Sequence, residues 1–83
     1  MEVTKMTRPL HRIAADIRAD WKNIYFGAAP YLEAMETLDS IDDMYVYDTA
    51  KSIVRYFLAN ANYWRGDVAR VIKAELKKMA GIK

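Results

Sequence analysis

The sequence predicts an all-α fold, a small compact bundle of about four helices organised around a central helix at residues 49–64. Along most of the chain, apolar residues recur at intervals of three and four, the spacing of one face of a helix. Glycine and proline residues separate these periodic stretches. Because 53% of the residues are hydrophobic and cysteine is absent, packing must stabilise the domain without disulfides or thiolate zinc sites.

A chain of 83 residues has the length of one domain. We expect residues 1–7 to form a flexible lead-in and residues 8–83 to form a single helical domain. The N-terminus lacks the apolar run of a signal peptide, and no stretch approaches the roughly 20 apolar residues of a membrane span. The sequence therefore favours a cytoplasmic protein that does not contact a membrane.

The first helix is expected to begin at Arg8 and Pro9, because proline at the first helical position has no amide to leave unbonded. Its apolar stripe comprises Leu10, Ile13, Ala14, Ile17, Trp21 and Ile24. Gly27 and Pro30 then interrupt the helical pattern, and a second helix is expected at residues 30–38. The second helix should turn Tyr31, Leu32, Met35 and Leu38 inward.

Residues 39–48 mix turn-forming residues with a short strand-like run and have no evident partner strand. We expect a loop or helical turn here, with Ile41, Met44 and Val46 folded back on the core. Four aspartates lie in this segment, but they lack the spacing and the glycine of a calcium-binding loop. Asp48 or Thr49 is the expected N-cap of the central helix.

The central helix has the longest apolar stripe in the chain. The stripe comprises Ala50, Ile53, Val54, Phe57, Leu58, Ala61 and Trp64. We expect Phe57 at the centre of the core, with Trp21 and Trp64 at least partly buried against it. Gly66 should end this helix, and Asp67 should cap the next one.

The last helix is expected from Asp67 to Met79, with Gly81 as its stop. Its predicted buried residues are Val68, Val71, Ile72, Leu76 and Met79. The opposite side is basic. Bases near a helix C-terminus also interact favourably with the helix dipole, so they do not require a ligand.

Charge is unevenly distributed along the chain, although the net charge is only +2. Residues 31–50 carry six acids and no base, whereas residues 65–83 carry six bases and two acids. Such an asymmetry can steer association, and a two-fold dimer could set the acidic 33–48 region of one chain against the basic 70–78 helix of the other. Alternatively, the two segments neutralise each other within one chain.

The residue types argue against an enzyme. His11 is the only histidine, cysteine is absent, and the acids are scattered, so neither a catalytic group nor a metal site is predicted. No cofactor is expected either.

A second line of residues on the central helix, Tyr56, Asn60 and Tyr63, lies beside the apolar stripe, with Arg55 and Arg65 at its margin. Tyrosine and arginine are favoured at protein interfaces, so this line predicts a protein-interaction surface, used by a homodimer or by another protein partner. The alternative is that both tyrosines belong to the core.

Nucleic-acid binding is the second functional hypothesis. The third and fourth helices, joined by a short glycine turn, resemble a helix-turn-helix in outline. The residues that could contact phosphates are Arg70, Lys73, Lys77 and Lys78. The small net charge and the acidic middle of the chain disfavour this hypothesis, because they would repel the same backbone.

The chain also resembles a group of known proteins. The resemblance rests on two stretches, FGAAPYLEAM and DTAKSIVRYFLANANYWRGDVARVIKAELKKM. Over roughly residues 10–80 the chain resembles small uncharacterised helical proteins of bacteriophages and other bacterial mobile elements. The matching positions are Tyr56, Phe57, Leu58, Asn60, Trp64, Arg65 and Gly66. The resemblance implies no activity, but it does imply that the partner could be a host protein.

Overall fold

The computed structural model describes residues 8–82, so the lead-in predicted at residues 1–7 lies outside the described residues. The elements in chain order are α1 (Leu10–Asp20), α2 (Ala29–Met35), β1 (Met44–Tyr45), β2 (Asp48–Thr49), α3 (Ala50–Ala59) and α4 (Asp67–Ala80). The predicted small helical bundle is confirmed, with one short hairpin added. Within residues 8–82, no helix is long and apolar enough to cross a membrane.

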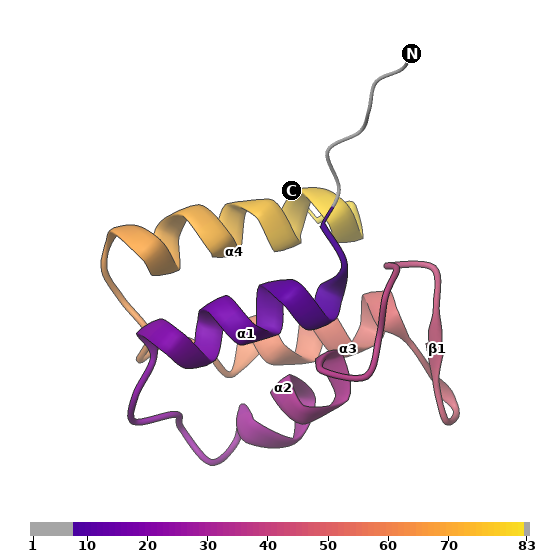
Figure 1. The fold of residues 1–83 in the computed structure, drawn as a ribbon, viewed down its shortest axis with the longest axis horizontal. Coiled ribbons are helices and arrows are strands. Elements are labelled where there is room, and N and C mark those ends of the chain that lie inside the picture. Colours follow the sequence, from indigo (N-terminus) through magenta and orange to yellow (C-terminus); the bar gives the residue numbers. More distant parts are fainter. Residues whose placement is uncertain (1–7, 83) are drawn as a thin grey trace.

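The four helices surround one core (Figure 1). Helix α2 packs against α1 and α3, and α4 packs against the same two helices from the other side. Helices α1 and α4 run in opposite directions along the long axis of the molecule (Figure 1). The core therefore has α1 and α3 at its middle, and α2 and α4 at opposite edges.

Aromatic side chains fill the centre of this core, as predicted. Phe57 is fully buried, and Trp21 and Trp64 are nearly so. The two indoles stack with ring centroids 5.8 Å apart, and Phe57 meets both with its edge, at 6.2 Å from Trp21 and 6.4 Å from Trp64. Such stacked and edge-to-face contacts stabilise a core beyond their buried area.

The boundaries of α1, α2 and α4 differ from the prediction by a few residues, and the end of the central helix differs by more. Pro9 is the N-cap of α1 rather than its first residue, and α2 ends at Met35. Helix α3 ends at Ala59, although its apolar periodicity continues to Trp64. The side-chain amide of Asn60 donates to the Tyr56 carbonyl at 2.8 Å, and the chain turns there. This turn brings Trp64 back against α1.

The segment before α3 forms a short hairpin, so the loop or helical turn expected at residues 39–48 is wrong. Strand β1 pairs with β2 in antiparallel register, Met44 opposite Thr49. Val46 lies in the turn with φ 55°, a conformation that β-branched residues rarely adopt. Met44 and Val46 are exposed rather than folded back on the core, whereas Ile41 is half-buried against it.

The end of the hairpin starts α3 as predicted. Thr49 is the N-cap, and its side-chain oxygen accepts from the Ser52 amide at 3.1 Å. Such a bond satisfies one of the amides that the first turn of a helix leaves free. The Ala50 amide also donates to the Asp43 carbonyl at 2.8 Å, which connects the hairpin to the helix.

The predicted burial of Val68 and Val71 in α4 is wrong, since both side chains are exposed. The buried residues of α4 are Ala69, Ile72, Leu76 and Ala80. The helix thus turns the stripe that contains Ala69 toward the core and its valines outward. Gly66 rather than Asp67 is the N-cap, with φ 111°, and Gly81 ends α4 in the left-handed region as predicted.

Replacing Phe57 by Ala should lower the free energy of unfolding by about 3–5 kcal/mol, because it leaves a cavity between two indoles. Urea denaturation followed by circular dichroism measures this change. Tyr47→Ala, at the exposed tip of the hairpin, is the control and should change stability by less than about 0.5 kcal/mol. A Phe57→Ala protein as stable as this control would contradict the central role of Phe57.

The hydrogen bonds of the Asp43 carboxylate predict that the stability of its loop depends on pH. The carboxylate accepts from the amides of Ser40 and Asp39 at 3.0 and 2.9 Å. These bonds, that of Ser40 first, hold the pKa of Asp43 below its ordinary value of about 3.8. A depressed carboxyl pKa stabilises the folded loop above pH 3.8, and this stability is lost as the pH falls through the lower, folded value.

Carbon-detected NMR of the Asp43 carboxyl group should therefore show a midpoint below 3.8. In Asp43→Asn, the Ser40 and Asp39 amide resonances should lose the part of their pH-dependent movement that follows the Asp43 carboxyl group. A carboxyl midpoint at or above 3.8 would contradict the capping role of Asp43.

Candidate interaction surface

The two tyrosines of the predicted interaction surface lie outside the core. Tyr56 is 48% exposed on α3 and Tyr63 is 73% exposed in the turn that follows. The alternative, that both are core residues, is therefore wrong for these side chains. Because α3 ends at Ala59, Tyr63 lies on a turn and not on a continuous helical line with Tyr56.

Each tyrosine packs against aromatic residues that precede or begin α2. The ring of Tyr56 lies 5.4 Å from that of Tyr31, and the ring of Tyr63 lies 5.3 Å from that of Tyr25. Tyr25 also contacts Phe26 at 4.8 Å. We call these five residues, Tyr25, Phe26, Tyr31, Tyr56 and Tyr63, the aromatic surface.

Asn60 lies between the two halves of the aromatic surface. Its side-chain nitrogen donates to the Tyr56 carbonyl, and its side-chain oxygen lies 3.0 Å from where a Cβ on Gly27 would stand. The same Cβ would lie 2.5 Å from the Tyr25 ring, closer than real Cβ atoms approach. Gly27 is therefore required for the close approach of Tyr25 and Asn60.

The two arginines predicted at the margin differ in position. Arg65 lines a hollow of about 270 Å³ together with Tyr25, Asn60 and Tyr63. Arg55 is exposed on α3 but does not line this hollow. The structure thus brings Arg65 to the aromatic surface through the turn after α3.

Phe26 is the residue that sequence periodicity missed. It is 81% exposed, and it lies in a segment that the sequence identified only as a helix break. A signal for its exposure was present in the sequence. Tyr25 and Phe26 form an aromatic pair directly before Gly27, in a segment that has no helical periodicity. Tyr31, expected to face inward, is half-buried and contributes to the surface.

His11 lies beside an acid near the start of α1. The Nε2 atom of His11 lies 3.1 Å from a carboxylate oxygen of Asp39, a pairing that sequence spacing did not predict. Between residues 8 and 82, no group of three or more histidines, cysteines or acids could hold a metal ion. The His11–Asp39 pair connects the start of α1 to the segment after α2.

Two of the four predicted phosphate contacts are engaged within the chain. Arg70 donates to Asp67 at 2.6 Å, and the Lys73 ammonium donates to the Trp64 carbonyl at 2.6 Å. Partial burial, followed by the charges of Arg65 and Lys77, lowers the pKa of Lys73. Lys73 is therefore a structural residue.

Lys77 and Lys78 are exposed near the end of α4. Two exposed lysines on one turn are a small electrostatic footprint for a nucleic-acid interface, which uses several phosphate contacts. In Figure 1, α4 runs back past α3 toward the start of that helix rather than crossing it steeply. A helix-turn-helix has its two helices at about 90–120°.

No protein-family model, curated protein or solved structure matches this chain.

The nucleic-acid alternative predicts a salt dependence that can be measured. If all four basic residues held phosphates, the log–log slope of duplex DNA affinity against salt would be about −3 to −4. We expect no sub-micromolar binding in fluorescence anisotropy at any salt concentration. Tight, salt-sensitive binding that Lys77→Glu with Lys78→Glu removes, and that the control Lys51→Glu on α3 does not, would contradict this expectation.

Proposed function

We propose that this chain is a small non-enzymatic protein-interaction module that binds through the aromatic surface. The observation that carries the proposal is the exposure of two rings that both pack against Tyr25, the wholly apolar ring of Phe26 and the ring of Tyr63. Exposed aromatic groups of this kind mark protein contacts, because burying them against a partner is favourable. Arg65 at the margin adds the side chain that interface hot spots share with tyrosine.

The size of the aromatic surface is compatible with a specific interface. An aromatic residue has about 200 Å² of surface to bury, so the exposed fractions of Phe26, Tyr63 and Tyr56 leave about 400 Å² accessible. A standard interface buries about 800 Å² on each partner. The three rings would form the apolar centre of such an interface, and neighbouring polar residues would form its rim.

A second copy of the chain is our first choice of partner. Two-fold association buries the same patch on both copies, and the charge asymmetry could add contacts between the acidic 33–48 region and the basic 70–78 helix. The resemblance to phage and mobile-element proteins supports a host protein as a further partner. A cytoplasmic location is part of the same proposal.

The test compares single substitutions in solution. Phe26→Ser and Tyr63→Ser should each convert the dimer to a monomer in light scattering, with helicity retained in circular dichroism, because both side chains are exposed in the monomer. Tyr47→Ser at the hairpin tip is the matched control, since Tyr47 is exposed and outside the aromatic surface. A parent protein that is monomeric at millimolar concentration, or a dimer unaffected by both substitutions, would contradict self-association through this surface.

A further inference from the structure

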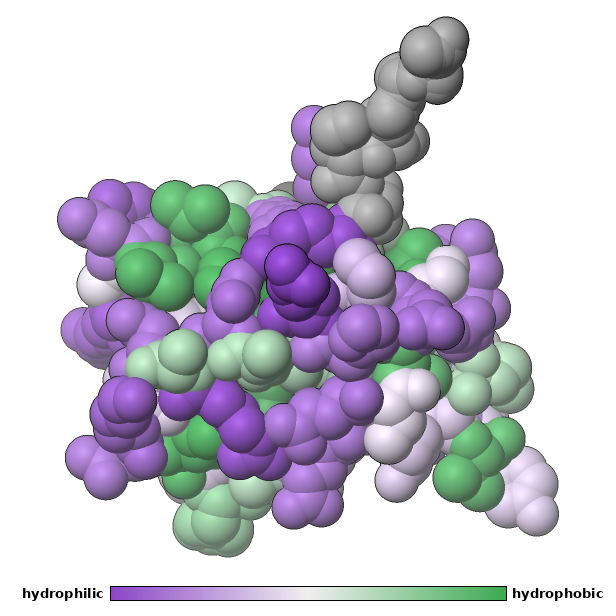
Figure 2. Space-filling view, viewed as in Figure 1, coloured by the Kyte–Doolittle hydropathy of each residue, from purple (hydrophilic) through white to green (hydrophobic). Residues whose placement is uncertain are grey.

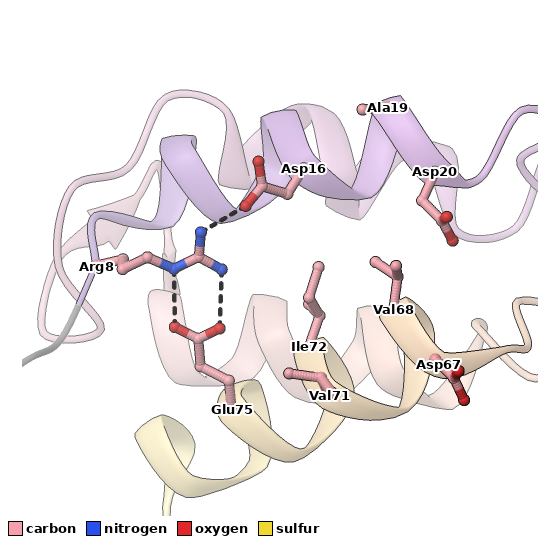
Figure 3. A pocket seen from close by; sticks show the side chains of 9 residues that line it. All are labelled: Arg8, Asp16, Ala19, Asp20, Asp67, Val68, Val71, Ile72 and Glu75. Carbon is pink, nitrogen blue, oxygen red and sulfur yellow. Dashed lines mark hydrogen bonds and ion pairs between the residues drawn. The ribbon is translucent and has the colours of Figure 1, made fainter.

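A groove lies between α1 and α4, on a different part of the molecule from the aromatic surface (Figure 3). Its volume is about 580 Å³, within the roughly 300–1,000 Å³ of binding pockets. Val68, Val71 and Ile72 of α4 line it opposite Ala19 of α1. The groove follows α4 for about two turns.

The lining of the groove exposes apolar side chains to water. Val71 is 63% exposed and Val68 is 44% exposed, while Ile72 beneath them is buried. In Figure 2 a hydrophobic group lies over the N-terminal part of α4, with hydrophilic residues around it. An apolar patch with a polar rim is typical of a protein-interaction site.

The charged residues of the groove are mostly acidic. Its lining contains four carboxylates and one guanidinium, a net charge of −3. The carboxylates belong to Asp16, Asp20, Asp67 and Glu75. The net charge of the groove is thus negative, whereas that of the whole chain is +2.

Arg8 closes one end of the groove. Its guanidinium donates to both Glu75 oxygens, at 2.9 and 3.0 Å, and also to Asp16 on α1 (Figure 3). These bonds, Glu75 first, raise the pKa of Arg8. Because the Arg8 guanidinium bonds Asp16 of α1 and Glu75 of α4 together, it holds this end of the groove at a set width before a ligand arrives.

The other end is open, and Asp20 keeps its negative charge there. Asp20 accepts the indole N–H of Trp64 at 2.8 Å, and this neutral donor leaves the carboxylate charge uncompensated. Asp67 pairs with Arg70, which does not line the groove.

We propose that the α1–α4 groove is a second docking site, which binds a basic amphipathic helix of a partner protein. Two apolar side chains of that helix, spaced by three or four residues, pack on Val68 and Val71. A lysine or arginine residue beside them contacts Asp20 at the open end. This is the helix-in-groove mode of recognition, in which apolar anchors give affinity and charge complementarity gives specificity.

Charge argues for such a partner over a second copy of this chain. A two-fold pair through the groove would bring two acidic rims together, which is unfavourable. Of the exposed apolar side chains of α4, Val68 and Val71 line the groove itself, which leaves only Ala74 to accompany the basic residues Arg70, Lys77 and Lys78. A second copy therefore does not offer the required combination of apolar and basic residues through this helix.

The test uses a designed 18-residue helical peptide with leucines on one face and lysines beside them, labelled for fluorescence anisotropy. Val71→Ser should weaken binding of the peptide about tenfold, because the serine no longer offers the apolar surface that the peptide buries. Asp20→Asn should weaken binding most at low salt, since the amide oxygen can still accept from Trp64 while the charge is gone. Two-dimensional NMR should place the perturbed resonances on α1 and α4.

Val46→Ser is the matched protein control, because Val46 is an exposed valine on the hairpin, remote in sequence from the groove. A peptide with the lysines replaced by glutamate is the matched ligand control. Binding that survives Val71→Ser, equal binding of the acidic peptide, no binding of the basic peptide at millimolar concentration, or perturbations away from α1 and α4 would each overturn the proposal. So would a dimer of the parent protein that Val71→Ser dissociates, since the occupant would then be a second copy.

Discussion

The position of Trp64 is the constraint on which the rest of the structure depends. Its indole stacks on Trp21 at the end of α1 and its N–H bonds to Asp20, while its carbonyl accepts from Lys73 of α4. A single residue, in the segment between α3 and α4, thus connects α1 and α4. Because it is almost fully buried, its N–H needs this acceptor, and an unsatisfied group there would cost about 1–3 kcal/mol.

Both candidate surfaces follow from how the chain reaches Trp64. The turn at Asn60 ends α3 early and leaves Tyr63 exposed beside Tyr25. After Trp64, Gly66 starts α4 in a rotation that presents Ala69 to the core and its valines to solvent. The same local geometry therefore creates an aromatic surface on one part of the molecule and an apolar groove on another.

The two surfaces differ in chemistry and would select different partners. The aromatic surface has rings and an arginine at its margin, whereas the α1–α4 groove has aliphatic side chains with carboxylates around them. Packing and charge complementarity both contribute to specificity, so each surface disfavours the ligand of the other.

The sequence by itself determined the helical class, the existence of all four helices, the buried centre at Phe57, a cap at Asp48 or Thr49 and the stop at Gly81. These follow from local rules, namely apolar spacing and the chemistry of caps. Tertiary structure decided where α3 ends, which face of α4 is buried, and that Phe26 and Tyr31 join Tyr56 and Tyr63. For α4 the reason is that its apolar residues fit two overlapping stripes at helical spacing, and only packing against α1 and α3 selects the stripe that is buried.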